Sequence, residues 1–264
     1  MSPGRHGDAP LFYSGYRKQI TIVASTPSQL SVFVHEGFRW NAQNAYLFDI
    51  DGTLLRCRDR IHVNAFLSSV RAVMGRDLSL DGVTLSGNTD PGILQEVFRL
   101  AALESVHWEP HFEAILQRMR EDVTARREEM KIEKMPGVDE ILCHLHARGA
   151  ALGIATGNLE TIGWLKIEFL GLRHWFSFGG FSDRFPRRSD MIAHAAATAR
   201  AHAGSHASVC VIGDTPADIA AARANQLPTI AVATGNYTFE QLLEHGPDAC
   251  ATNLLALLAT PEQP

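Results

Sequence analysis

The stretch NAYLFDIDGTLLRC, residues 44–57, joins a core-like apolar run to two carboxylates. Ala45 to Phe48 is an apolar run in which Tyr46 to Phe48 reads as a short buried strand, and Asp49 and Asp51 follow it, before a Gly-Thr pair. Carboxylates beside a core are costly unless their charge is compensated. Because Asp before Gly is also a common turn signal, this stretch becomes informative only together with the rest of the chain.

Short apolar runs alternate with helical patterns along the chain. The expected strands are 46–48, 150–155, 176–181, 208–212 and 229–233. The expected helices between and after them are 138–148, 159–170, 189–202 and 217–225. This alternation predicts an α/β fold, in which right-handed strand–helix–strand units build a parallel sheet covered by helices on both faces.

One segment breaks the alternation. Residues 58–135 contain helical patterns at 63–74, 92–103 and 112–134 and no convincing strand. We therefore expect an inserted helical domain. The predicted domains are an N-terminal extension of unknown role, a core in two pieces and a helical insert, at residues 1–40, 41–57 with 136–264, and 58–135. The extension contains one strand-like run, at 20–24.

Composition excludes several classes of protein. The net charge of −5 argues against a general nucleic-acid binder, and no apolar run is long enough to span a membrane. The N-terminus has no apolar region typical of a secretory signal. The four cysteines form no CxxC pair, so we expect no zinc site, no disulfide framework and a cytoplasmic location. Cys143 and Cys210 lie in apolar patterns and are expected in the core, whereas the oligomeric state is not indicated.

Polar groups gather where the predicted strands end. In open parallel sheets, ligands bind beyond the carboxyl ends of the strands. The groups that follow three of the strands are Asp49 and Asp51; Thr156, Gly157 and Asn158; and Asp214 and Asp218. Each alone is more often a turn or a helix cap. Together they place four carboxylates at one edge, which needs a cation, and oxygen ligands of this kind favour Mg²⁺.

The sequence resembles a known family at these positions. DIDGT (49–53), ATGN (155–158) and GDTPADI (213–219) are similar to the signature motifs of the haloacid dehalogenase-like hydrolases. The resemblance covers roughly residues 44–250 and is nearest to the phosphoglycolate-phosphatase-like branch. It implies a Rossmann-like core with a mobile helical cap, which matches residues 58–135. It also implies a Mg²⁺-dependent phosphatase acting on a small phosphorylated metabolite.

The resemblance also implies roles for single residues. Asp49 would be the nucleophile that forms an aspartyl-phosphate. Asp51 would protonate the leaving oxygen and then activate water. Phosphoryl oxygens would be held by Thr156, Gly157 and Asn158. The metal ligands would be Asp49, the main-chain carbonyl of Asp51, and Asp214, with Asp218 supporting them.

One family feature is missing. The family usually has a lysine near the start of the helix before the last motif, and RFPRRSDMIAHA (184–195) contains none. We expect Arg188 to take that catalytic and phosphate-binding role, with Arg187 as the alternative, since a guanidinium binds carboxylate or phosphate through two N–H groups. Lys166 lies mid-helix and is expected to be solvated.

Some assignments stay open within the insert. The polar loop Gly87 to Asp90 is either a capped helix start or a source of substrate contacts. Arg56, Arg58 and His62 are either contacts for an anionic substrate or ordinary loop charges.

Other functions are also compatible with parts of the pattern. A phosphomutase would keep all the core motifs. A dehalogenase would not need Asp51, and a phosphonatase would need an amine from the insert, where Lys131 and Lys134 lie only near its end. The intact carboxylates oppose a non-catalytic binding protein. The expected partner is therefore a small metabolite, with neither nucleic acid nor membrane.

Overall fold

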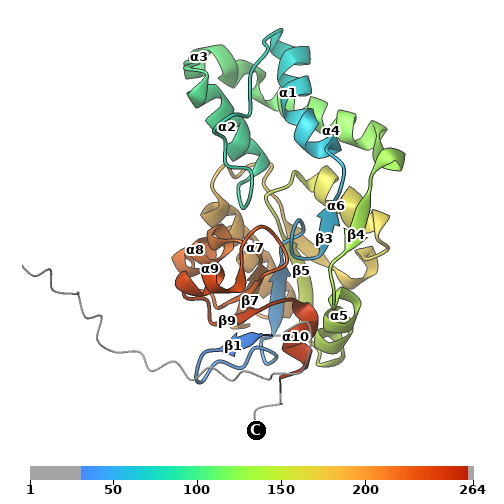
Figure 1. Ribbon diagram of the computed structural model, residues 1–264, viewed down its shortest axis with the longest axis vertical. Helices are drawn as coiled ribbons and strands as arrows, with labels where there is room; N and C mark the ends of the chain where they lie inside the picture. Colours follow the sequence, from blue (N-terminus) through green and yellow to red (C-terminus); the bar gives the residue numbers. More distant parts are fainter. Residues whose placement is uncertain (1–30, 261–264) are drawn as a thin grey trace, which may run out of the picture.

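The computed structural model of the chain describes residues 31–260, so the strand-like run at 20–24 lies outside the described residues. Seven strands form one sheet in the order β1-β9-β8-β7-β2-β5-β6 (Figure 1). The strands are β1 Val32–Val34, β2 Ala45–Phe48, β5 Ala151–Ala155, β6 Phe178–Gly180, β7 Val209–Gly213, β8 Thr229–Val232 and β9 Ala249–Ala251. β1 runs antiparallel to β9, and the other neighbours are parallel. The predicted α/β fold with a parallel sheet is confirmed.

Helices cover both faces of this sheet because side chains along each strand alternate. On β2, Tyr46 and Phe48 join the core cluster that holds residues of α5, α6 and α10, whereas Ala45 and Leu47 join the cluster of α7 and α8. The helices of the core are α5 Val138–Ala147, α6 Glu160–Phe169, α7 Arg188–Ala203, α8 Pro216–Ala224, α9 Phe239–Glu244 and α10 Leu254–Leu258. A strand with both faces buried explains why 45–48 reads as a continuous apolar run.

The helical segment lies between two short strands. β3 (Leu55–Cys57) pairs antiparallel with β4 (Ile132–Lys134), and the chain between them forms the helices at one end of the molecule (Figure 1). These helices are α1 Ile61–Met74, α2 Asp90–Leu100, α3 Ser105–Trp108 and α4 Phe112–Ala125, with short 3₁₀ turns at Glu109–His111 and Arg127–Glu129. Buried side chains of α4 recur at helical spacing, which builds the contact with α1: Ile115, Leu116, Met119 and Val123.

Three local differences from the sequence prediction stand out. The helix expected at 112–134 ends at Ala125, and β4 follows within a segment that was expected to hold no strand. β1 lies inside residues 1–40, assigned to an extension, and adds an antiparallel edge strand to the sheet. Cys210 is buried as expected, but Cys143 is exposed on α5, so that prediction was wrong. The boundaries between core and cap stay a prediction.

Helix length and hydropathy bear on the membrane prediction. Across residues 31–260, none of the helices combines the length and the apolar character that a bilayer crossing requires. The cytoplasmic location stays a prediction.

Candidate active site

Three strands end side by side and bring their polar groups together. Phe48 at the end of β2 pairs with Ile154 of β5 and with Ile212 of β7. Because the chains leave the sheet at the same edge, Asp49 and Asp214 follow next to each other. Asp218 adds a third carboxylate from the first turn of α8.

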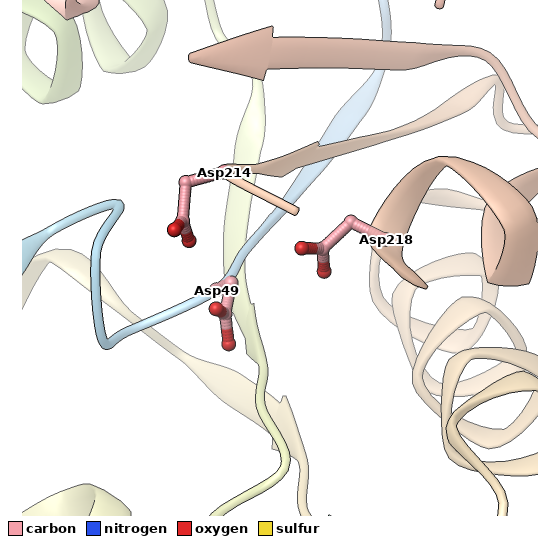
Figure 2. Close-up of side chains that lie close together, drawn as sticks. All are labelled: Asp49, Asp214 and Asp218. Atoms are coloured by element: carbon pink, nitrogen blue, oxygen red, sulfur yellow. The ribbon is translucent and has the colours of Figure 1, made fainter. Parts of the chain in front are cut away.

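The three carboxylates form one buried cluster. Figure 2 shows the side chains of Asp49, Asp214 and Asp218 lying close together, with Asp218 projecting from its helix toward the other two. One oxygen from each lies within 4.8 Å of the others, and the three residues are 5%, 2% and 0% exposed. The structure thus brings together three of the four carboxylates expected at this edge.

Two glycines allow the backbone to enclose Asp214. Gly52 has φ +90°, and a Cβ there would lie 2.3 Å from Asp214 Oδ2. A Cβ at Gly235 would lie 1.8 Å from the same oxygen. Thr53 donates its hydroxyl to Asp214 Oδ1 at 3.2 Å. The Gly-Thr pair after Asp51 therefore shapes the carboxylate site as well as the turn.

A capping box fixes Asp218. The Thr215 main-chain N–H donates to Asp218 Oδ2 at 3.1 Å, and the Thr215 hydroxyl lies 2.6 Å from the same oxygen. Because Thr215 binds Oδ2 of Asp218, the other oxygen, Oδ1, is the one that contacts the positively charged side chain of the cluster.

That cation is the guanidinium of Arg188, the first residue of α7. Its Nη2 lies 3.0 Å from Asp49 Oδ1 and 2.6 Å from Asp218 Oδ1, and the residue is only 8% exposed. Arg187 instead pairs with Asp190 at the surface, where its side chain is 79% exposed. The structure therefore places Arg188, and not Arg187, beside the expected nucleophile.

Charge in the cluster is not balanced. Burial raises the pKa of Asp49 to about 7, with Asp218 and Asp51 adding to the shift and Arg188 opposing it. Burial, together with Asp49 and Asp218, raises the pKa of Asp214 well above its usual range. Three carboxylates and one guanidinium leave two negative charges if all ionise. The donor set and the charge therefore fit a divalent hard cation such as Mg²⁺.

The fourth carboxylate, Asp51, is bound by a lysine that the sequence placed in solvent. Lys166 of α6 is 1% exposed, and its Nζ lies 2.7 Å from Asp51 Oδ2 and 2.9 Å from Oδ1. Burial would raise the pKa of Asp51, but the ammonium of Lys166 and hydrogen bonds from Lys166 and Asn158 outweigh it and lower the pKa. The expectation of a solvated Lys166 was wrong.

Asn158 and Thr156 form a polar group beside Asp51. The Asn158 amide donates to Asp51 Oδ2 at 2.8 Å and to Thr156 Oγ1 at 2.7 Å, and its oxygen accepts from Lys166 at 2.9 Å. Thr156 and Asn158 are buried, and both border the same pocket as Gly157. The amide nitrogen and oxygen of the Asn158 side chain are thus both engaged in hydrogen bonds with neighbouring side chains.

Seven of the eight predicted site residues line one pocket of about 430 Å³. The eighth, Asp218, forms an ion pair with Arg188, one of the lining residues. The insert supplies the opposite wall, with His62, Phe66, Asn88, Asp90 and Ile93. Arg56 also borders the pocket, whereas Arg58 pairs with Glu133 at the surface. A pocket lined by the core on one side and by the insert on the other suits a substrate enclosed between these two parts.

The loop at Gly87 to Asp90 docks on the core. The Asp90 N–H donates to Gly157 O at 2.7 Å, and the Thr89 hydroxyl donates to Pro186 O at 2.6 Å. Thr89 also caps α2 by accepting from Gly92 N. The loop is therefore a helix cap that also borders the pocket, so the two interpretations left open by the sequence are compatible.

The motifs that carry the carboxylates lie within a region that matches a known protein family. The family model described as haloacid dehalogenase-like hydrolase matches residues 46–232, which contain all the carboxylates of the site. The chain belongs to this family of hydrolases. The recognition made from the three motifs is confirmed.

Relatives of the chain include phosphatases. It is 28% identical to the phosphoglycolate phosphatase of Agrobacterium fabrum over 214 residues, which cover 80% of this chain and 89% of the relative. It is 33% identical to that of Mesorhizobium japonicum over 128 residues, covering 48% of this chain and 56% of the relative. Among solved structures, a hydrolase from Pseudomonas syringae shares the fold with a TM-score of 0.64 at 20% identity, over 82% of this chain and 96% of that one.

Proposed function

We propose that this phosphatase of the haloacid dehalogenase-like family removes phosphate from a small phosphorylated metabolite, in a Mg²⁺-dependent reaction through an aspartyl-phosphate on Asp49. The observation that carries the proposal is the buried cluster of three carboxylates with oxygens within 4.8 Å, of which Asp49 and Asp214 line the pocket. The similarity to the A. fabrum phosphoglycolate phosphatase supports a small phosphate monoester as substrate.

The cluster supplies ligands for the metal. Asp49, Asp214 and the main-chain carbonyl of Asp51 would hold Mg²⁺, and Asp218 would support them through Arg188. When bound, the ion neutralises charge on the phosphoryl oxygens and on the carboxylates that face them. This accounts for three acidic side chains in a site with one guanidinium.

In the first step, an oxygen of Asp49 attacks phosphorus. The bond from phosphorus to the leaving oxygen breaks, and that oxygen takes a proton from the carboxyl of Asp51. Arg188 holds Asp49 through the contact at 3.0 Å and so orients the attacking oxygen. Thr156 and the main chain of residues 157–158, which follow the neighbouring strand β5, would hold the phosphoryl oxygens.

In the second step, Asp51 acts as a base. It takes a proton from water, which attacks phosphorus and releases inorganic phosphate and the carboxylate of Asp49. The lowered pKa of Asp51 favours its ionised form, the form that this step needs. In the first step, the anionic phosphoryl group beside Asp51 favours protonation of the carboxyl.

Hydrolysis of 4-nitrophenyl phosphate and of a panel of small phosphate monoesters, phosphoglycolate among them, tests the proposal. We expect turnover that depends on Mg²⁺, releases inorganic phosphate and falls by roughly three orders of magnitude or more in Asp49→Asn. Asp81→Asn is the matched control, because Asp81 is exposed and its side chain bonds Ser79. Equal turnover in wild type and Asp49→Asn would contradict the proposal, and transfer of phosphate to a second hydroxyl without release would indicate a phosphomutase.

A further inference from the structure

Lys166 is a buried cation that the two steps above do not use. Its Nζ has four neighbours: both oxygens of Asp51 at 2.7 and 2.9 Å, Asn158 Oδ1 at 2.9 Å and His62 Nδ1 at 3.2 Å. An ammonium carries three protons and accepts nothing. With four acceptors around three protons, Lys166 has no proton left for a substrate, so any effect on the reaction must pass through its neighbours.

Asp51 is the neighbour that it holds most tightly. Oδ1 contacts Lys166 and the thiol of Cys57 at 3.5 Å, and Oδ2 contacts Lys166 and the Asn158 amide at 2.8 Å. Yet 41% of the Asp51 side chain is exposed, and the residue borders the pocket. The carboxylate is thus held by its neighbours while part of the Asp51 side chain stays open to the pocket.

The fourth contact of Lys166 reaches the insert. Because an ammonium can only donate, His62 Nδ1 is the acceptor, and its Nε2 therefore carries the proton in the neutral ring. Nε2 lies 3.1 Å from Asp90 Oδ2, which also accepts from Leu159 N at 2.8 Å. His62 belongs to α1 and Asp90 to α2. A continuous chain of contacts thus joins α1 and α2 of the insert to Asp51 in the core.

We propose that Lys166 is a positioning residue: it fixes the orientation of the Asp51 carboxylate for proton transfer, and the His62–Asp90 pair holds Lys166 in place when the insert is docked. The inference rests on the proposed function, because it assigns Lys166 to the acid–base step of that reaction. The competing role is a salt bridge that only stabilises the fold. The two roles differ in one respect: a positioning residue acts only while Asp51 is present.

A double-mutant cycle separates the two roles. Turnover of 4-nitrophenyl phosphate with Mg²⁺ is measured in wild type, Lys166→Met, Asp51→Asn and the double variant, together with KM and Tm. This substrate has a leaving group that needs little protonation, so Asp51→Asn keeps measurable single-turnover activity. We expect Lys166→Met to lower kcat about 100-fold, with KM within about threefold, and to lower it by less than about threefold when it is added to Asp51→Asn.

Two results would overturn the proposal. One is a loss of kcat from Lys166→Met that is equally large in the wild-type background and in the Asp51→Asn background. The other is a kcat of Lys166→Met within about threefold of wild type. Lys131→Met is the matched control, because it removes an exposed lysine, and it should behave as wild type.

A second variant covers the case in which Lys166→Met does not fold. His62→Phe removes the acceptor for Lys166 but keeps an aromatic ring for the stack on Phe66, whose ring lies 5.4 Å away. We expect about a tenfold loss of kcat that disappears in the Asp51→Asn background. A loss that persists there would refute the link from insert to Asp51. Asp49→Asn is assayed in parallel: if it stays active, the proposed function fails, whatever Lys166 does.

Discussion

Nη2 of Arg188 lies 3.0 Å from Oδ1 of Asp49, so a permanently charged group at the start of α7 contacts the expected nucleophile. The same atom reaches Asp218, which makes one guanidinium the shared partner of two buried carboxylates. Nε of Arg188 also lies 3.0 Å from the same Asp218 oxygen, so the guanidinium binds Asp218 through two N–H groups while it contacts Asp49. The position of Arg188 supports the prediction that it takes the role of the missing lysine.

Replacing Arg188 by Met should cost both activity and stability. Asp49 and Asp218 would lose their partner while remaining buried, which we expect to lower the free energy of unfolding by about 3 kcal/mol without metal. We expect kcat to fall about 100-fold, because the attacking carboxylate is no longer oriented. Urea unfolding and steady-state kinetics measure the two effects.

The neighbouring arginine provides the control. Arg187→Met removes a surface charge whose partner is Asp190 on the same helix, so both properties should stay near those of wild type. A larger loss of activity in Arg187→Met than in Arg188→Met would reverse the assignment of the two arginines.

Stability without metal should fall as pH rises. The pKa of Asp49 is raised by burial from 3.8 to about 7, so the folded protein keeps a proton that the unfolded chain releases. The stability from this group is complete below about pH 4 and is lost as pH rises to about 7. In the proposed site Mg²⁺ would bind the ionised carboxylate, so the stabilisation by added Mg²⁺ should grow over the same pH range.

Urea unfolding at several pH values measures how the free energy of unfolding changes with pH, with EDTA and with Mg²⁺. Asp49→Asn is the control, since an amide does not titrate and the metal-free slope should flatten. The prediction fails if the increase in the free energy of unfolding on addition of Mg²⁺ is independent of pH in the wild type.

Gly157→Ala should interfere with docking of the insert. A Cβ at Gly157 would lie 2.1 Å from the carbonyl oxygen of Asn88, so the loop of the insert could not approach to its present distance. We expect kcat/KM to fall at least about tenfold, because misplacement by about 1 Å is costly. The radius of gyration from X-ray scattering should increase, since the insert can move away from the core.

Gly82→Ala is the control within the insert, because it strains the backbone without adding a clash with the core. Gly82 has φ +79°, so Ala is strained there by about 1 kcal/mol, but its Cβ would meet only Leu100 at 3.6 Å. Stability should decrease slightly and kcat/KM should not. Unchanged kcat/KM and scattering in Gly157→Ala would show that the loop adjusts without undocking.

Most of the sheet and of the carboxylate cluster could be predicted, because each depends on local sequence. Strands buried on both faces give continuous apolar runs, and the acidic residues directly follow them in recognisable motifs. The strands β1 and β9 were not predicted: each has three residues, and their antiparallel pairing brings together two segments far apart in the sequence. β4 was hidden by charged residues, since Glu133 and Lys134 are exposed in a strand that pairs only with β3.

The position of Lys166 was missed because it depends on tertiary contacts. One signal was available: Lys166 comes four residues after Ile162 and next to Ile167, both buried, and so shares the apolar face of α6. A lysine on a buried face needs a carboxylate partner. Which carboxylate it meets, and that His62 approaches from the insert, follows only from the folded chain.

The antiparallel pairing of β3 with β4 has a consequence for how this architecture can diversify. Leu55 lies opposite Lys134, so the chain leaves the sheet and returns to it through adjacent strands. The segment between these two strands therefore begins and ends at neighbouring points beside the core. Exchange of this segment would therefore change the residues that it contributes to the pocket, while the carboxylates that follow β2 and β7 would keep their positions.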